Sequence, residues 1–379
     1  MTRPAIYLDH NAASPLLPVA RAAVVEALEL VGNPSSVHGH GRALRAMIDK
    51  ARGQVARLAG AERGQVVFTG SATEALTQAI IGGTKAFKSD GVLLTAGEHA
   101  AVLSAASATG LPVTTIGLDT DGRIDLAQLR AALAAAEGNL LVAVHWVNNE
   151  TGVVQPMAEI NALVGPTPHT LVVDAVQAFG RIPLDFAASA PDMMAVSAHK
   201  IGGPAGVGAL LVKSHADTVR LIPGGGQELG RRGGTESAAL IAGFGAAAAA
   251  NSYDADAMRT LVERVETGLR RMAPEVVIFG AGAERVGNVV DFAVPGVASA
   301  TAMMALDLAG ISVSSGSACS SGKVGLSHVL AAMAVPPELA GCALRVSFGW
   351  NSTADEADAF LAAYETILLR QRARRGEAA

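Results

Sequence analysis

The chain has 379 residues, of which 50% are hydrophobic and 17% are charged, and its formal net charge at pH 7 is −5. This size predicts about two to three packed domains, and the composition excludes a disordered or collagen-like chain. The acidic balance argues against a nucleic-acid partner, because neutralising a run of phosphates requires a surplus of Lys and Arg.

Short β-rich runs alternate with helical stretches through the first two thirds of the chain. The predicted strands are 66–69, 92–95, 113–116, 140–147, 171–174, 193–196 and 207–212. This alternation is typical of βαβ units around a mainly parallel sheet that is buried under helices. The sequence therefore predicts an α/β fold that binds ligands at the carboxyl ends of its strands.

One long helical stretch, from about residue 236 to 272, is predicted to end this pattern. Beyond it, three helices are predicted together with strands at 276–279, 288–294 and 343–348. We expect a large domain from 16–251, and a smaller α+β domain that combines 1–15 with 252–379.

The two cysteines, Cys319 and Cys342, lie too near the C-terminal end to form a disulfide framework for the chain. No signal peptide is recognised at the start, so a reducing cytoplasm is expected. The longest apolar run, 238–250, is shorter than the roughly 18 residues of a membrane span. We therefore expect no membrane segment.

Three motifs that follow predicted strands carry chemistry. Ser71, Ala72 and Thr73 begin a helix, where backbone N–H groups favour a phosphate, although ordinary helix capping explains the same residues. Asp174 ends a buried strand, where an acid needs a positive partner. Lys200 ends the next strand and is either a surface cation or an amine held near a carbonyl.

Together, a phosphate cup, an acid for a ring nitrogen and a lysine for an aldehyde are the parts of a pyridoxal phosphate site. A dinucleotide-binding site and a nucleotide triphosphate-binding loop are both disfavoured. The chain has no strict G-x-G-x-x-G, and residues 316–324 depart from a phosphate-binding loop in spacing and at Val324.

Several motifs resemble those of the cysteine desulfurases, which are pyridoxal phosphate enzymes of the class-V aminotransferase group. They are SATE (71–74), VNNETG (147–152), VDAVQ (173–177), SAHK (197–200) and SSGSACSSG (314–322). The resemblance begins at Tyr7, extends to the RVSFG motif at Arg345, and favours the NifS/IscS type. It implies a fold-type I transferase with a large, mainly parallel domain and a smaller α+β domain.

The resemblance also implies roles for individual residues. Lys200 would bond to the cofactor aldehyde, Asp174 would pair with the ring nitrogen and Gln177 would contact the phenolate oxygen. His99 would stack on the ring and relay protons. Further cofactor contacts are expected at Ala72, Thr73, Ser197 and His199 and at Thr235 of the other subunit, and substrate contacts at Asn149 and Arg345.

Cys319 is expected to be the nucleophile, because its Ser- and Gly-rich surroundings favour an exposed thiol. Cys342 is interpreted as a small buried hydrophobe. The resemblance implies a homodimer that converts L-cysteine to L-alanine and leaves a persulfide on Cys319. The sulfur would pass to an acceptor protein such as an iron–sulfur scaffold, and no metal ligands are expected.

Residues 75–78, Leu229 and Gly233 depart from the family's usual pattern. Two other functions stay open. One is a related pyridoxal phosphate lyase, epimerase or aminotransferase, including a selenocysteine lyase, in which Cys319 would be incidental. The other is a non-catalytic partner of a true desulfurase.

Overall fold

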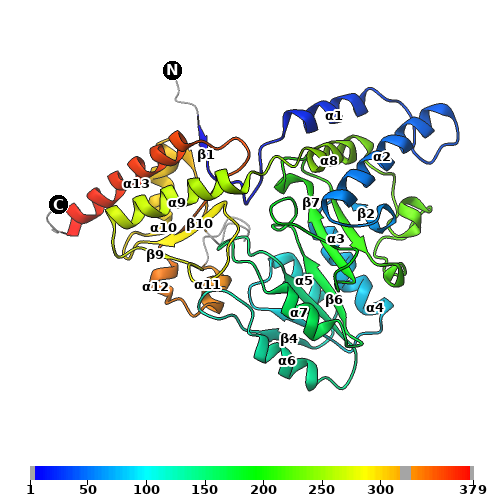
Figure 1. Cartoon of the computed structure of the whole chain (residues 1–379), viewed down its shortest axis with the longest axis horizontal. Coiled ribbons are helices and arrows are strands. Elements are labelled where there is room, and N and C mark those ends of the chain that lie inside the picture. Colours follow the sequence, from blue (N-terminus) through cyan, green and yellow to red (C-terminus); the bar gives the residue numbers. More distant parts are fainter. Residues whose placement is uncertain (1–4, 316–325, 376–379) are drawn as a thin grey trace.

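The computed structural model describes residues 5–315 and 326–375, and its largest element is a seven-stranded sheet (Figure 1). The strand order is β2-β8-β7-β6-β5-β3-β4. β8 is antiparallel to both neighbours, and the other pairs are parallel. The strands are β2 (Val66–Thr69), β3 (Gly91–Thr95), β4 (Val113–Ile116), β5 (Leu140–His145), β6 (Thr170–Asp174), β7 (Met193–Ser197) and β8 (Gly208–Val212). The mainly parallel sheet is thus confirmed.

Both faces of this sheet are buried. Along β5, Val142 and Val144 belong to one hydrophobic core, whereas Leu141 and Ala143 belong to another. Successive side chains of a strand point to opposite faces, so a strand buried on both faces is apolar throughout. That is why these strands are recognisable as continuous hydrophobic runs.

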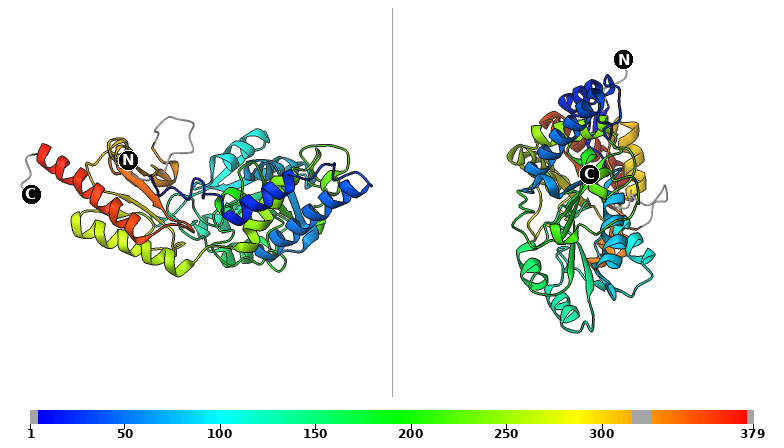
Figure 2. Two further views of the ribbon diagram at one scale, coloured as in Figure 1. Left: turned by 90° about the horizontal axis from the view of Figure 1, so that it is seen from above. Right: turned by 90° about the vertical axis from the view of Figure 1, so that its right-hand side faces the viewer.

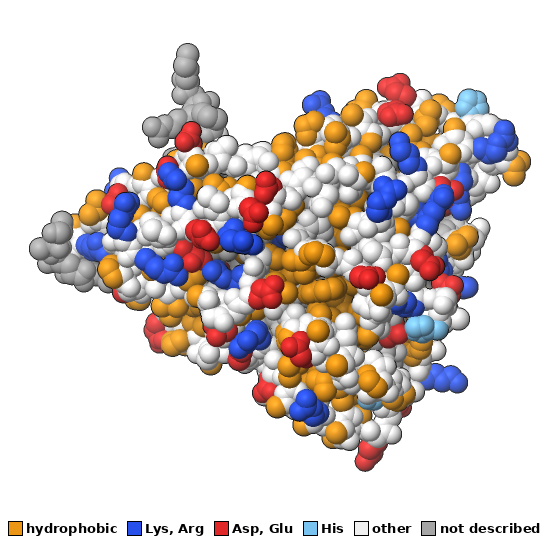
Figure 3. Space-filling model, in the orientation of Figure 1, with side chains coloured by type: hydrophobic (Ala, Val, Ile, Leu, Met, Phe, Trp, Pro, Cys, Tyr) orange, Lys and Arg blue, Asp and Glu red, His pale blue; other side chains and the backbone are white. Residues whose placement is uncertain are grey.

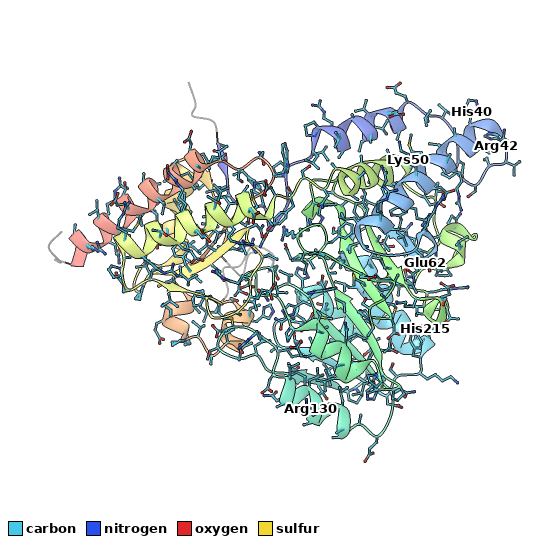
Figure 4. All side chains as sticks on the ribbon, viewed as in Figure 1. His40, Arg42, Lys50, Glu62, Arg130 and His215 are labelled. Atoms are coloured by element: carbon cyan, nitrogen blue, oxygen red, sulfur yellow. The ribbon has the colours of Figure 1, made fainter. Side chains whose placement is uncertain are left out.

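Helices cover the two faces. α1 (Pro18–Leu28) and α2 (Gly39–Leu58) both pack against α8 (Ala238–Ala250). In Figure 4, His40 and Arg42 project from the start of α2, at the end of the molecule opposite the C-terminus. The other helices of this part are α3 (Ala72–Thr77), a π-helical turn (Gln78–Gly82), α4 (Gly83–Ala86), α5 (Ala100–Ala108), α6 (Leu126–Ala134) and α7 (Met157–Val164), with 3₁₀ turns at Arg63–Gln65, Ala198–Lys200, Ser214–Ala216 and Gln227–Gly230.

A smaller antiparallel sheet, β12-β10-β9, lies toward the other end of the elongated molecule (Figure 2). Its strands are β9 (Val277–Ile278), β10 (Val289–Ala293) and β12 (Ala343–Ser347), accompanied by α9 (Ala255–Met272), α10 (Ser299–Leu308), α11 (His328–Ala332), α12 (Pro337–Ala340) and α13 (Ala354–Arg375). The N-terminal strand β1 (Ile6–Tyr7) pairs with β11 (Ile311–Ser312). Leu8, which follows β1, belongs to the hydrophobic core that the small sheet forms with its helices. Within the described part of the chain, no helix is both long and apolar enough to cross a membrane.

The structure corrects two predictions about helices. The stretch 236–272 is not one helix, because α8 ends at Asn251, whose φ of 35° lies in the left-handed region that asparagine tolerates. Asp254 then caps α9 by accepting from the backbone N–H groups of Asp256 and Ala257. Beyond β9 the described residues form four helices instead of three, because α11 and α12 are separate short turns.

Candidate active site

A cavity of about 310 Å³ opens at the carboxyl ends of the parallel strands. Asp174 ends β6, His145 ends β5, and Lys200 follows β7. The small sheet contributes Arg345 of β12, and the N-terminal segment contributes Asn11. Nine of the predicted site residues line this cavity, together with their neighbour Ser71. The nine are Ala72, Thr73, His99, Asn149, Asp174, Gln177, His199, Lys200 and Arg345.

Lys200 is held by the N-terminal segment. It lies at the end of the short 3₁₀ turn that follows β7, and its Nζ donates to the carbonyl oxygens of Asn11 at 2.6 Å and Ala12 at 2.8 Å. Asn11, Ala12 and Lys200 all line the cavity. The amine is therefore fixed at the cavity wall and is a candidate nucleophile toward a carbonyl compound there.

Asp174 is a buried acid within this cavity, with 8% of its surface exposed. Its Oδ1 accepts from the backbone N–H of Val176 at 2.9 Å. Burial raises the pKa of its carboxyl group, and the ion pairs between described residues do not include it. A ligand that brings a positive N–H group to Asp174 would supply the missing charge.

The two predicted histidines are both held in place. His99 caps α5, because its Nδ1 accepts from the backbone N–H of Ala101 at 3.1 Å. The proton of the neutral His99 ring therefore lies on Nε2. His199 Nδ1 lies 2.8 Å from Ser197 Oγ, and burial lowers the pKa of His199 to about 4. Ser197 is fully buried and lies behind His199, outside the cavity lining.

The start of α3 has the helix cap that the sequence suggested. Ser71 caps the helix, since its Oγ accepts from the backbone N–H of Glu74 at 3.1 Å. Ala72 and Thr73 follow directly and line the cavity. Ordinary capping is thus confirmed, and the same turn presents its first residues to the space where a phosphate is expected.

Arg345 already has a charged partner. This side chain is 2% exposed, and it donates to Asp9 Oδ1 at 2.7 Å and to the carbonyl oxygen of Asn149 at 3.1 Å. Its Nε is buried without a hydrogen-bond partner among the described residues. A substrate carboxylate that binds Arg345 must therefore share the guanidinium with Asp9, which the sequence did not indicate.

Glu150 is a buried acid beside this arginine. Burial raises the pKa of Glu150 from 4.5 to about 7, opposed by a hydrogen bond from Ser327 and by the charges of Arg345 and His99. A second acid, Asp291, pairs opposite Arg345 in the small sheet, and burial raises its pKa well above the ordinary value. Burial thus makes the charged form of both carboxyl groups less favourable than it is in water.

We expect the free energy of unfolding to fall as pH rises from about 4.5 to about 7. Over this range the folded chain keeps the Glu150 proton that the unfolded chain has lost. The shift in the pKa of Glu150 corresponds to a loss of about 3 kcal/mol in the free energy of unfolding. Urea unfolding across this range should show a shallower decline for Glu150→Gln. Equal declines for both proteins would contradict the raised pKa.

Thr235 is exposed and does not line the cavity of its own chain. The preceding turn is anchored by Glu228, which has a left-handed φ of 49° and is 1% exposed. Glu228 accepts from Arg52 at 2.6 and 2.8 Å and from the backbone N–H of Phe68 at 2.9 Å. The turn that precedes Thr235 is therefore fixed to β2.

Arg52→Met is expected to destabilise the chain by about 3–5 kcal/mol, because it leaves the Glu228 carboxylate buried without its cation. Chemical denaturation measures this loss. Arg264→Met is the matched control, since Arg264 and Asp358 pair at an exposed site and the change should hardly move the midpoint. Equal effects of the two substitutions would contradict this account.

Cys319 lies outside the described residues. Cys342 is buried at 5% exposure, and its Sγ lies 3.3 Å from the carbonyl oxygen of Glu338, which confirms its interpretation as a buried side chain.

Over the face shown in Figure 3, positive and negative side chains are interspersed. Among the described residues, no group of His, Cys, Asp and Glu could hold a metal ion.

Sequence reasoning assigned no role to Asn11, His145 or Arg181. His145 carries the same signal as Asp174, a polar residue at the end of a buried parallel strand, and could have been found. Asn11 lies in the YLDHNAASP motif, but its contribution is a backbone carbonyl, which residue type does not reveal. Nothing in the sequence around Arg181 indicates a role, because its contact with the Gln177 side chain depends on how the folded turn places the two residues.

A family model described as aminotransferase class-V matches residues 6–360, and the chain belongs to this family. Within it, the chain is 40% identical to a cysteine desulfurase of Cereibacter sphaeroides, with 97% of each chain covered. It is 36% identical to an IscS-like cysteine desulfurase of Mycobacterium tuberculosis, again over 97% of each chain.

Solved structures agree with these relatives. A NifS-like protein from Rickettsia africae matches with a TM-score of 0.88 and 32% identity, covering 96% of this chain and 99% of that one. The apo structure of a cysteine desulfurase from Thermococcus onnurineus matches with a TM-score of 0.84 and 25% identity, covering 97% and 95%. The predicted fold-type I architecture and the resemblance in motifs are both confirmed.

Proposed function

We propose that the chain is a pyridoxal phosphate-dependent cysteine desulfurase that converts L-cysteine to L-alanine. The observation that carries this proposal is the meeting of Lys200, Asp174 and the start of α3 in one cavity. The full-length relatives named cysteine desulfurases support it.

The cavity's chemistry fits pyridoxal phosphate. Its volume of about 310 Å³ lies in the range of small-ligand sites. Asp174, which is buried and forms no ion pair with a described Lys or Arg, suits a protonated ring nitrogen. Lys200 suits the aldehyde, and Gln177 suits the phenolate oxygen. The phosphate would lie against Ala72, Thr73 and His199, with Ser197 supporting His199.

Bound pyridoxal phosphate would supply an electron-accepting ring that stabilises negative charge at the substrate Cα. Asp174 would pair with the ring nitrogen and favour its protonated form, which would strengthen this effect. Lys200 Nζ takes the proton from the substrate Cα, and His99 Nε2 relays protons nearby. Arg345 and Asn149 orient the substrate carboxylate.

The sulfur transfer uses Cys319. Its thiolate attacks the substrate sulfur, a sulfur–sulfur bond forms, and the substrate Cβ–Sγ bond breaks with its electron pair remaining on carbon. A proton then adds to Cβ. The products are L-alanine and a persulfide on Cys319, so the substrate carbon is reduced while the two sulfurs are oxidised to the persulfide level.

The assembly around this site is also proposed. Thr235 would reach the phosphate of a second copy's cofactor, which its exposure in the single chain permits. The persulfide sulfur would pass to an acceptor protein such as an iron–sulfur scaffold. We place the enzyme in the cytoplasm, where thiols stay reduced.

The test is an anaerobic assay of cofactor-loaded protein with L-cysteine and a reductant, following alanine and sulfide together. Equimolar products support the desulfurase. Alanine production that persists unchanged in Cys319→Ser would favour a related lyase, and amino transfer to a 2-oxo acid would favour an aminotransferase. A protein that binds no pyridoxal phosphate would restore the non-catalytic alternative.

A further inference from the structure

Arg181 is a buried cation that pairs with no acid in the part of the chain that the structure describes. The side chain is 9% exposed and follows the turn after β6. Its Nη1 donates to the backbone carbonyl of Gln177 at 3.4 Å and to the side-chain Oε1 of the same residue. The ion pairs formed among the described residues do not include Arg181. Burying a guanidinium without a carboxylate is costly, so packing alone does not explain it.

The groups around Arg181 do not neutralise it. His10, Lys200 and Tyr253 line a small cavity of about 30 Å³ with it, large enough for roughly one water molecule. Burial lowers the pKa of His10 to about 4 and raises that of Tyr253, so both are neutral near pH 7. Lys200 and the nearby Arg345 are themselves cations. None of the described residues that line this small cavity therefore brings a negative charge to Arg181.

Arg181 acts on that cavity through Gln177. The guanidinium only donates hydrogen bonds, so the Gln177 atom that faces it must be Oε1. The Asn11 carbonyl only accepts, so the atom facing it at 3.0 Å must be Nε2. The two contacts agree and fix the amide in one orientation. Gln177 also lines the larger cavity, and its Nε2 carries a second proton.

The same carbonyl joins Gln177 to Lys200. Asn11 O accepts from Gln177 Nε2 and, at 2.6 Å, from Lys200 Nζ. Arg181, Gln177, Asn11 and Lys200 thus form one hydrogen-bonded series that ends at the proposed reactive amine. A charged donor at one end polarises the amide and strengthens its N–H as a donor.

We propose that Arg181 is a positioning residue that orients and polarises the Gln177 amide, so that Nε2 donates to a ligand oxyanion beside Lys200. This inference rests on the proposed function, in which that oxyanion is the phenolate oxygen of pyridoxal phosphate. By polarising Gln177, the positive charge of Arg181 would stabilise the negative oxygen and lower the pKa of the nitrogen that joins Lys200 to the cofactor.

The test uses cofactor-loaded protein without substrate. The visible absorption of bound pyridoxal phosphate is titrated with pH in the wild type, Arg181→Met, Arg181→Lys and Gln177→Met. We expect Arg181→Met and Gln177→Met each to raise the titration midpoint by about one to two pH units, as for the loss of a hydrogen bond to a charged group. Arg181→Lys keeps the charge and should show a smaller rise.

The double variant Arg181→Met/Gln177→Met separates this role from a direct effect of charge. We expect no rise beyond that of Gln177→Met alone, whereas additive rises would overturn action through Gln177. An unchanged midpoint in Arg181→Met would also overturn the inference. If that variant does not fold, Gln177→Met and Arg181→Lys decide, and unchanged midpoints in both overturn it. A wild type that binds no pyridoxal phosphate would refute the proposed function itself.

Discussion

Lys200→Ala is expected to lower the rate of alanine formation from L-cysteine by about 10⁴-fold or more. The substitution removes both the amine that would bond to the cofactor and the proposed base for the substrate Cα proton. It also frees the Asn11 and Ala12 carbonyls that Lys200 holds. The measurement is alanine release under saturating L-cysteine, with pyridoxal phosphate supplied to every sample.

Lys213→Ala is the matched control, because Lys213 follows the neighbouring strand β8 outside the cavity lining, where its Nζ donates to the backbone carbonyl of Ala187 and lies 5.0 Å from the centre of the Phe186 ring. This variant should keep wild-type turnover. Comparable turnover in Lys200→Ala and the wild type would remove Lys200 from the reaction and with it the proposed cofactor site.

Asp174→Asn is expected to reduce kcat by about 10²–10³-fold. Asparagine keeps the shape of the side chain but cannot hold a positive charge on the ring nitrogen, so stabilisation of the negative charge at the substrate Cα is lost. Because the carboxyl group is buried and its pKa is raised in the free chain, removing its charge should not destabilise the fold. Steady-state kinetics and thermal unfolding together test both statements.

Asp192→Asn provides the comparison at the opposite end of the sheet. Asp192 precedes β7, where it accepts from the backbone N–H of Leu171 and from His215. Its loss should affect stability and leave kcat close to that of the wild type. A kcat for Asp174→Asn equal to that of Asp192→Asn would show that position 174 has no electrostatic role.

The strands of the large sheet could be predicted because burial on both faces makes them apolar throughout. Helix boundaries were less predictable, since the break at Asn251 depends on one left-handed residue in an otherwise helical sequence. The short helices α11 and α12 carry few residues each, so their hydrophobic pattern gives little signal.

In the site, side chains that follow strands could be predicted, whereas contacts made across the fold could not. Lys200 and Asp174 have their positions set by local sequence. The pairing of Arg345 with Asp9 joins residues from opposite ends of the chain, and the support of Gln177 by Arg181 depends on how a turn closes. The domain division near residue 251, the role of Thr235 and the second subunit stay predictions.

The most direct measurement locates the sulfur after a single turnover. Anaerobic, cofactor-loaded protein is mixed with one equivalent of L-cysteine, alanine is quantified, and the digested chain is examined by mass spectrometry. The account predicts one alanine for each sulfur atom gained by the Cys319 peptide, with Cys342 unmodified and with no gain in Cys319→Ala. Sulfur on Cys342, or full turnover by Cys319→Ala, would contradict it.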